Sequence, residues 1–229
     1  MQNKHQVHNL IILDESGSMS SIKSLIINGF NELVQSVKGI ERQFPEQEHL
    51  ISMVSFNDLN NNILHFVDPV NKLDAINYST YNPASMSPLY DAMGFSISKL
   101  KQYLEGKENY SVLVTVLTDG EENASKEYSG TAIKNLVAEL KQQNWTFTYI
   151  GADHDVEGMA SKMNIQNTMS FDKNNLDIKR MFIKESKSRF KYSLNIRNGE
   201  SDTNDYYSKI QNNEVKVDGF WKKLISEKK

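Results

Sequence analysis

Residues 10–20 of this chain read LIILDESGSMS, and the fold of the protein follows from this stretch. Its first four residues are apolar and lead into Asp14, a pattern typical of a buried strand in a parallel sheet. Asp14, Ser16 and Ser18 then alternate around a glycine, which allows a tight turn. Such a loop can direct a carboxylate and two hydroxyls to one side, and a compact set of hard oxygens suits Mg²⁺ first, then Ca²⁺ or Mn²⁺. The alternative is that Ser18 or Ser20 caps the following helix and that Asp14 only ends the strand.

A second motif of the same kind lies near the middle of the chain. The apolar run 112–117 ends in a Thr-Asp-Gly turn, which puts Asp119 at the carboxyl end of another predicted strand. Before this run, Ser87-Pro88 is a typical helix start, with serine at the N-cap and proline at the first helical position. The hydroxyl of Ser87 could instead supply a third oxygen to the first loop. The two roles compete for its lone pairs.

Together these motifs resemble the metal-ion-dependent adhesion site of von Willebrand factor type A (vWA) domains. The family pattern is Asp-x-Ser-x-Ser, then Thr, then Asp. It is matched here by Asp14, Ser16, Ser18, Ser87 and Asp119. Ser87 stands where the family usually has threonine, which keeps the hydroxyl but loses a methyl group that helps to fix its rotamer. The resemblance is to bacterial proteins in which the domain stands alone.

The resemblance implies a coordination scheme and a kind of partner. Ser16 and Ser18 would bind the ion directly, and Ser87 would bind it directly or through water. The two carboxylates would act mainly through water, or one of them directly. The ion, Mg²⁺ or else Mn²⁺ or Ca²⁺, then attracts one more anion, which in the family is a Glu or Asp side chain of a protein partner. In the family such binding can be coupled to movement of the C-terminal helix.

The rest of the chain alternates between predicted strands and helices. Residues 49–56 and 63–67 form two strands with a connection so short that they must be antiparallel, because a parallel crossover needs a dozen or more residues. Further strands are expected at 145–150 and 168–171. Apolar spacing predicts helices at 22–37, 89–105, 133–140, 156–163 and 174–190. This pattern predicts an α/β fold: a doubly wound, mostly parallel, vWA/Rossmann-like sheet with one antiparallel edge strand and helices on both faces.

Other carboxylates also follow predicted strands, namely Glu121, Glu122, Asp153 and Asp155. We expect these four near helix N-termini, where negative charge is favoured. We expect Asp172 to cap the last helix. The metal is expected only at Asp14 and Asp119.

Composition narrows the class of protein. The 229 residues are 38% hydrophobic, enough for a real core. A net charge of −3 gives no basic surface for nucleic acid. The absence of cysteine excludes disulfides, thiolate metal sites and cysteine nucleophiles. No run approaches the length of a membrane span, and the N-terminus lacks an apolar signal core, so we expect a cytoplasmic protein.

The vWA domain is predicted over 5–190, and 191–229 is predicted to be a C-terminal appendage. Its composition is polar up to a short amphipathic end at 220–225, where apolar residues recur at four-residue spacing. This end either docks on a partner or membrane surface, or packs back on its own domain, or frays.

An enzyme is not expected, although two alternatives to a binding module stay open. A metal-dependent phosphoester hydrolase of the haloacid-dehalogenase type also places an Asp at a strand end, but it needs a second Asp where this chain has Ser16. The chain has no Gly-x-x-x-x-Gly-Lys loop and no Gly-x-Gly-x-x-Gly, and its histidines lack metal-ligand spacing. The other alternative is a scaffold with a vestigial metal site.

Overall fold

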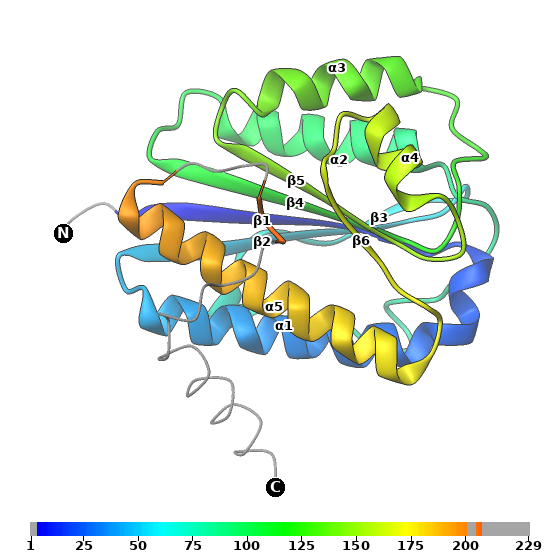
Figure 1. Ribbon diagram of the computed structural model, residues 1–229, viewed down its shortest axis with the longest axis horizontal. Helices are drawn as coiled ribbons and strands as arrows, with labels where there is room; N and C mark the ends of the chain where they lie inside the picture. Colours follow the sequence, from blue (N-terminus) through cyan, green and yellow to red (C-terminus); the bar gives the residue numbers. More distant parts are fainter. Residues whose placement is uncertain (1–3, 201–204, 208–229) are drawn as a thin grey trace, which may run out of the picture.

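The two apolar runs that carry the motifs become neighbouring central strands of one sheet. The computed structural model describes residues 4–200 and 205–207, and its strands lie in the order β3-β2-β1-β4-β5-β6 (Figure 1). The strands are β1 (His5–Asp14), β2 (Gln47–Phe56), β3 (Asn61–Pro69), β4 (Tyr110–Thr118), β5 (Trp145–Gly151) and β6 (Asn167–Ser170). All neighbours are parallel except β3, which runs antiparallel to β2 at the edge. The predicted fold class is confirmed.

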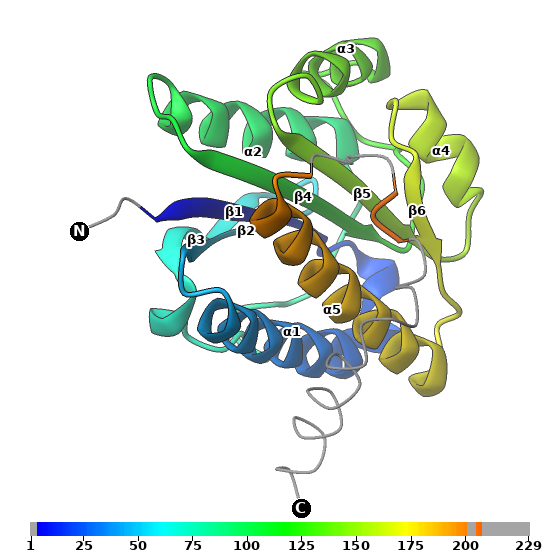
Figure 2. The ribbon, with the colours of Figure 1, turned by 60° about the vertical axis from the view of Figure 1, so that its left-hand side comes forward.

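Helices cover both faces of this sheet. The helical segments are η1 (Gly17–Ile22), α1 (Lys23–Gln43), η2 (Val70–Lys72), α2 (Leu89–Leu104), α3 (Gly130–Leu140), α4 (Val156–Lys162) and α5 (Asn175–Asn198). Figures 1 and 2 show α1 and α5 side by side on one face, and α2, α3 and α4 on the other. Within the described part of the chain, no helix is long and apolar enough to cross a membrane.

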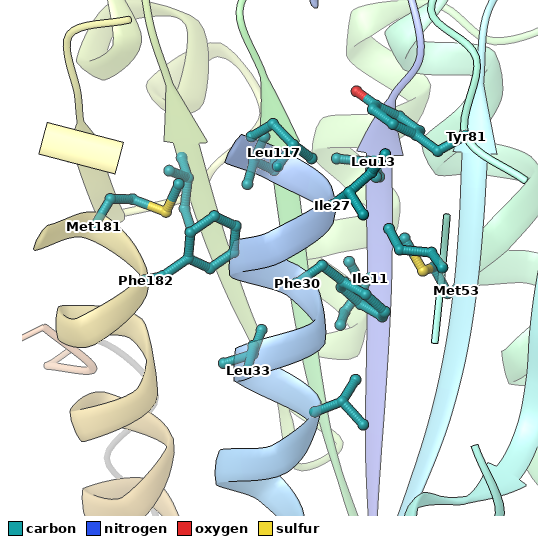
Figure 3. Close-up of a cluster of buried hydrophobic side chains, with 14 of the residues drawn as sticks. Ile11, Leu13, Ile27, Phe30, Leu33, Met53, Tyr81, Leu117, Met181 and Phe182 are labelled. Atoms are coloured by element: carbon teal, nitrogen blue, oxygen red, sulfur yellow. The ribbon is translucent and has the colours of Figure 1, made fainter. Parts of the chain in front are cut away.

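Each face of the sheet has its own hydrophobic core. Side chains alternate along β1, so Ile11 and Leu13 pack with α1 and α5 (Figure 3), while Ile12 packs with α2. This double burial is why β1 is a continuous apolar run. Between α1 and α5 the packing is so close that a Cβ added to Gly29 would lie 2.0 Å from the ring of Phe182.

The order of the strands creates a switch point between β1 and β4. The chain leaves β1 toward β2 and β3 and then returns to place β4 on the other side of β1. The pairing of Leu13 with Leu117 makes Asp14 and Thr118 end their strands side by side. Crevices of this kind, at the carboxyl ends of parallel strands, are where open α/β sheets bind ligands.

The last helix begins where it was predicted, but its capping residue and its C-terminal end differ from the prediction. Its N-cap is Asn174, whose side chain accepts a hydrogen bond from the N–H of Asp177 at 2.9 Å, so the predicted cap at Asp172 is wrong. It continues to Asn198 and ends at Gly199, which adopts the left-handed conformation with φ 72°. The predicted end at residue 190 is therefore too early.

Tertiary contacts explain why the polar residues after 190 stay helical. Gln47 of β2 donates a hydrogen bond to the backbone oxygen of Ser193 at 2.8 Å. Tyr192 donates to the backbone oxygen of Val112 at 3.3 Å. Both contacts tie the last turns of α5 to the sheet. The amphipathic end predicted at 220–225 lies outside the described residues.

Candidate functional site

Asp14 joins three loops at the carboxyl edge of the sheet. This buried carboxylate accepts a hydrogen bond from the N–H of Ser16 at 2.7 Å through Oδ1. Through Oδ2 it accepts from the hydroxyls of Ser87 at 3.0 Å and Thr118 at 2.5 Å. The ends of β1 and β4 and the loop before α2 therefore meet at one side chain.

The remaining predicted site residues extend this cluster. The hydroxyl oxygens of Ser16 and Ser18 lie 3.1 Å apart, and Ser18 donates to Oδ1 of Asp119 at 2.6 Å. Ser16, Ser87 and Asp119 are buried, whereas Ser18 is exposed. We call Asp14, Ser16, Ser18, Ser87 and Asp119 the open cluster. The structure brings all five predicted residues together, with Ser18 at the solvent side.

Ser87 does not cap α2. The N-cap position is Pro88, which makes no side-chain cap bond, and the Ser87 hydroxyl is directed to Asp14 instead. The first turn of α2 is capped from another loop, where Oε2 of Glu122 accepts from the N–H of Tyr90 at 2.9 Å. The predicted N-cap role of Ser87 is wrong. The first turn of α2 finds its acceptor in Glu122, which is distant in the sequence, and not in the serine directly before the helix.

The helix-cap alternative for the first loop also fails. The N-cap of α1 is Ile22, with no side-chain cap bond. Ser18 is directed to Asp119, and Ser20 donates weakly to the backbone oxygen of Pro83 at 3.4 Å. Ser20 therefore lies in the same loop without taking part in the open cluster.

Three of the four other carboxylates lie near helix starts, while Glu121 is exposed in the loop between β4 and α3. Asp155 is the N-cap of α4 and accepts from the N–H of Gly158 at 3.0 Å. Glu122 caps α2, as described above. Asp153 lies just before α4, but its carboxylate pairs with Lys173, with 2.7 Å between Oδ2 and Nζ.

Lys173 brings a positive charge into the site. Its Nζ lies 2.6 Å from Oδ2 of Asp119 and so bridges the carboxylates of Asp119 and Asp153. Burial alone would lower the pKa of Lys173, but the hydrogen bonds to the two carboxylates outweigh it and raise the pKa above its ordinary value. The side chain is therefore an ammonium ion held against the open cluster.

Sequence reasoning missed Lys173, Thr118 and Glu15. Thr118 was visible in the Thr-Asp-Gly motif, but its role as a donor to Asp14 was not. Glu15 is buried and accepts from the hydroxyl of Ser55 at 2.6 Å and from the backbone N–H of Asn82, which fixes the loops around the cluster. No local pattern signals either Glu15 or Lys173.

The electrostatics of the cluster favour a bound cation. Burial raises the pKa of the Asp14 carboxyl above its ordinary value, against the lowering effect of hydrogen bonds from Thr118 and Ser16, and the charge of Asp119 adds to the rise. A cation close by would stabilise the charged forms of both carboxylates.

The donor set fits a hard divalent cation. It consists of two carboxylates and three hydroxyls, all oxygen ligands. Across residues 4–200 and 205–207, no group of three or more His, Cys, Asp or Glu side chains is placed to hold a metal ion. Any ion here would therefore depend on serine hydroxyls. The ammonium of Lys173 occupies a position beside Asp119 where a positive charge is stabilised.

Comparisons with known proteins agree with the fold. The family model of the von Willebrand factor type A domain matches residues 10–189. A von Willebrand factor type A structure from Catenulispora acidiphila is similar with TM-score 0.52 and 12% identity, covering 82% of this chain and 43% of that one. The VWA domain of SpRpn10 is similar with TM-score 0.50 and 10% identity, covering 78% and 94%.

A third similar structure is the pilus adhesin SpaC from Lactobacillus rhamnosus GG in an open conformation, with TM-score 0.59 and 12% identity, covering 83% of this chain and 31% of the adhesin. This chain therefore spans less than half of the Catenulispora and Lactobacillus chains, and identities this low concern the fold alone. No curated protein sequence matches the chain significantly. Because the family model matches most of its length, the chain belongs to the von Willebrand factor type A domain family.

Proposed function

We propose that this domain binds a protein partner through a divalent cation held by the open cluster. Mg²⁺ is the first candidate, with Mn²⁺ or Ca²⁺ as alternatives. The observation that carries the proposal is the convergence of three hydroxyls and two carboxylates at the switch point of the sheet. The vWA family often mediates protein interactions and adhesion.

The hydrogen bonds of the serines support this assignment. Ser18 donates its hydroxyl proton to Asp119, and Ser87 donates to Asp14. A hydroxyl that donates its proton still has lone pairs for a cation, although the oxygen of Ser18 also faces the hydroxyl of Ser16 at 3.1 Å. Ser16 and Ser18 would bind directly, Ser87 directly or through water, and the two carboxylates mainly through water. When bound, an ion with so few anionic ligands acts as a Lewis acid that attracts a carboxylate.

We propose that the partner offers a Glu or Asp side chain surrounded by apolar residues. Two exposed apolar side chains flank the site: Leu59 is 68% exposed and Met86 is 51% exposed. Met86 directly precedes Ser87, and its backbone exchanges two hydrogen bonds with Asp58, of 3.1 and 3.0 Å. An apolar rim beside a charged anchor suits a protein ligand better than a small anion.

Thermal unfolding in EDTA, Mg²⁺, Mn²⁺ and Ca²⁺ tests the metal. An ion at a hundred times its dissociation constant should add about 2.7 kcal/mol to the free energy of unfolding. For a domain of this size the midpoint should rise by about 5–10 °C. Ser18→Ala should lose this shift, because its hydroxyl is a proposed direct ligand. Ser20→Ala removes a hydroxyl from the same loop and should keep it.

Other outcomes would change the proposal. No shift with any ion in the wild-type protein would leave a scaffold with a vestigial site. Asp14→Ala is a second test, but it also removes three hydrogen bonds, so Ser18→Ala is the cleaner variant. Hydrolysis of a phosphoester that disappears in Asp14→Ala would establish the hydrolase alternative instead.

A further inference from the structure

We infer that Lys173 is a tethered cation that competes with the divalent ion for the open cluster and links the state of the cluster to the start of α5. This inference rests on the proposed metal site and adds a residue that sets its affinity. Its basis is the position of one ammonium group between the carboxylates of Asp119 and Asp153, on the residue that directly precedes the N-cap of α5.

The first step concerns Asp119. Its Oδ1 accepts the hydroxyl proton of Ser18, and its buried Oδ2 has no other hydrogen bond in the described part of the chain, so Lys173 compensates its charge. The same carboxylate is a proposed ligand of the ion. Two positive charges beside one carboxylate repel each other. A divalent ion therefore weakens the binding of the Lys173 ammonium to Asp119, and Lys173 weakens the binding of the ion to the same extent.

The second step concerns Asp153, which has no place in the metal motif. It holds the other side of the ammonium at 2.7 Å and adopts a left-handed backbone conformation, with φ 60°. Asparagine tolerates this conformation well. Asp153→Asn therefore loosens Lys173 while leaving the five residues of the open cluster and the local backbone unchanged.

The third step concerns α5. Lys173 directly precedes Asn174, the N-cap whose side chain holds the first turn of the helix. While its ammonium is bound, the residue before the cap is fixed to the ends of β4 and β5 through Asp119 and Asp153. Release of the ammonium removes this anchor. Binding of an ion to the open cluster thereby loosens the segment 171–178.

Calorimetric titration with Mg²⁺ and with Mn²⁺ tests the competition in the full chain. Lys173→Met keeps the apolar stem and should bind the ion tighter than the wild-type protein, by on the order of tenfold. Asp153→Asn should also bind tighter. Lys179→Met is the matched control, because Lys179 is an exposed lysine of α5, and it should leave the affinity unchanged.

The outcomes separate this inference from the proposed function. If the wild-type protein binds and Lys173→Met binds equally or more weakly, the competition is refuted and the metal site stands. Weaker binding by Asp153→Asn would make Asp153 a ligand and also refute it. Binding only by Lys173→Met would support the competition and contradict metal-dependent function of the native chain. If no variant binds an ion, both ideas fail.

Hydrogen exchange tests the link to α5. In the wild-type protein, Mg²⁺ should speed amide exchange over 171–178 relative to EDTA. In Lys173→Met the same segment should exchange fast already in EDTA and change little with Mg²⁺. Exchange that is unaffected by the ion in the wild-type protein, at concentrations where calorimetry shows binding, would refute the link.

Discussion

Two polar clusters of this molecule differ in how their charges are balanced. The closed cluster lies between α5 and the sheet and consists of Asn9, Thr115, Glu185, Arg189 and Tyr206, all buried. The open cluster lies at the carboxyl edge, with Ser18 exposed to solvent. One is sealed under a helix, and the other faces the outside.

The closed cluster is balanced within itself. Arg189 pairs with Glu185 at 3.0 Å and donates to Asn9 at 2.6 Å and to Thr115 at 2.7 Å. The hydroxyl of Tyr206 donates to Glu185 at 3.0 Å. One positive and one negative charge satisfy each other, so no ligand is needed.

The open cluster is not balanced in this way. Asp14 and Asp119 belong to it and Asp153 lies beside it. Within the described residues, Lys173 pairs with Asp119 and Asp153, and Asp14 is held by neutral donors. The proposed exchange of Lys173 for a divalent ion depends on this excess negative charge and on the exposed hydroxyl of Ser18. The comparison teaches that a buried charge with an internal partner needs no ligand, whereas an unbalanced and accessible one leaves room for the ion proposed above.

Arg189→Met should produce the largest effect, because it breaks the closed cluster. It leaves Glu185 buried without its ion-pair partner and should lower the free energy of unfolding by about 3–5 kcal/mol. Chemical denaturation in EDTA measures the loss. Arg180→Met is the control, since Arg180 forms an exposed pair with Asp177 and should cost less than about 1 kcal/mol. Equal losses in the two variants would contradict the structural role of the closed cluster.

The buried His49 should make stability depend on pH. Burial, with the charge of Arg189 adding to it, lowers the pKa of His49 from 6.5 to about 3. Because the unfolded chain takes up the proton first, stability is full above pH 6.5 and is lost as the pH falls toward the folded pKa. Between pH 7 and pH 5 the loss should be about 2 kcal/mol from this residue.

His49→Gln measures this contribution. It removes the titrating ring next to Asn9 and should flatten the fall in stability between pH 7 and pH 5. The buried His8, whose pKa is lowered to about 4 mainly by burial, should keep a second contribution of the same sign. An unchanged pH profile in His49→Gln would show that the ring is protonated without cost beside the closed cluster.

Tyr206→Phe should have the smallest effect of the three. It removes one hydroxyl donor from Glu185, while Tyr207 still donates to the same carboxylate at 2.9 Å. We expect a loss of about 1–2 kcal/mol in the free energy of unfolding. Tyr78→Phe, at a ring that is 63% exposed, should change it by less than about 0.5 kcal/mol. A neutral Tyr206→Phe would mean that Arg189 and Tyr207 together satisfy Glu185 without the hydroxyl of Tyr206.

Much of the fold was predictable because short, local sequence patterns specify its strands and helices. Apolar runs ending in Asp14 and Asp119 marked β1 and β4, and apolar spacing marked the helices. The C-terminal end of α5 was not predictable in this way, because Gln47 and Tyr192 hold its last turns through contacts with the sheet. The bacterial stand-alone type, the cytoplasmic location and the domain division at 190/191 stay predictions.

The sequence by itself determined the α/β class and the antiparallel edge strand, since these follow from local patterns and one short connection. It also supplied the five candidate residues of the open cluster, while the order of the strands came from the structure. Only the tertiary structure decided which groups balance their charges. Lys173 reaches Asp119, and Arg189 reaches Asn9, across long stretches of sequence. A lone Lys or Arg has the same local pattern whether it is solvated or buried, so its partner is fixed only when the sheet and α5 come together.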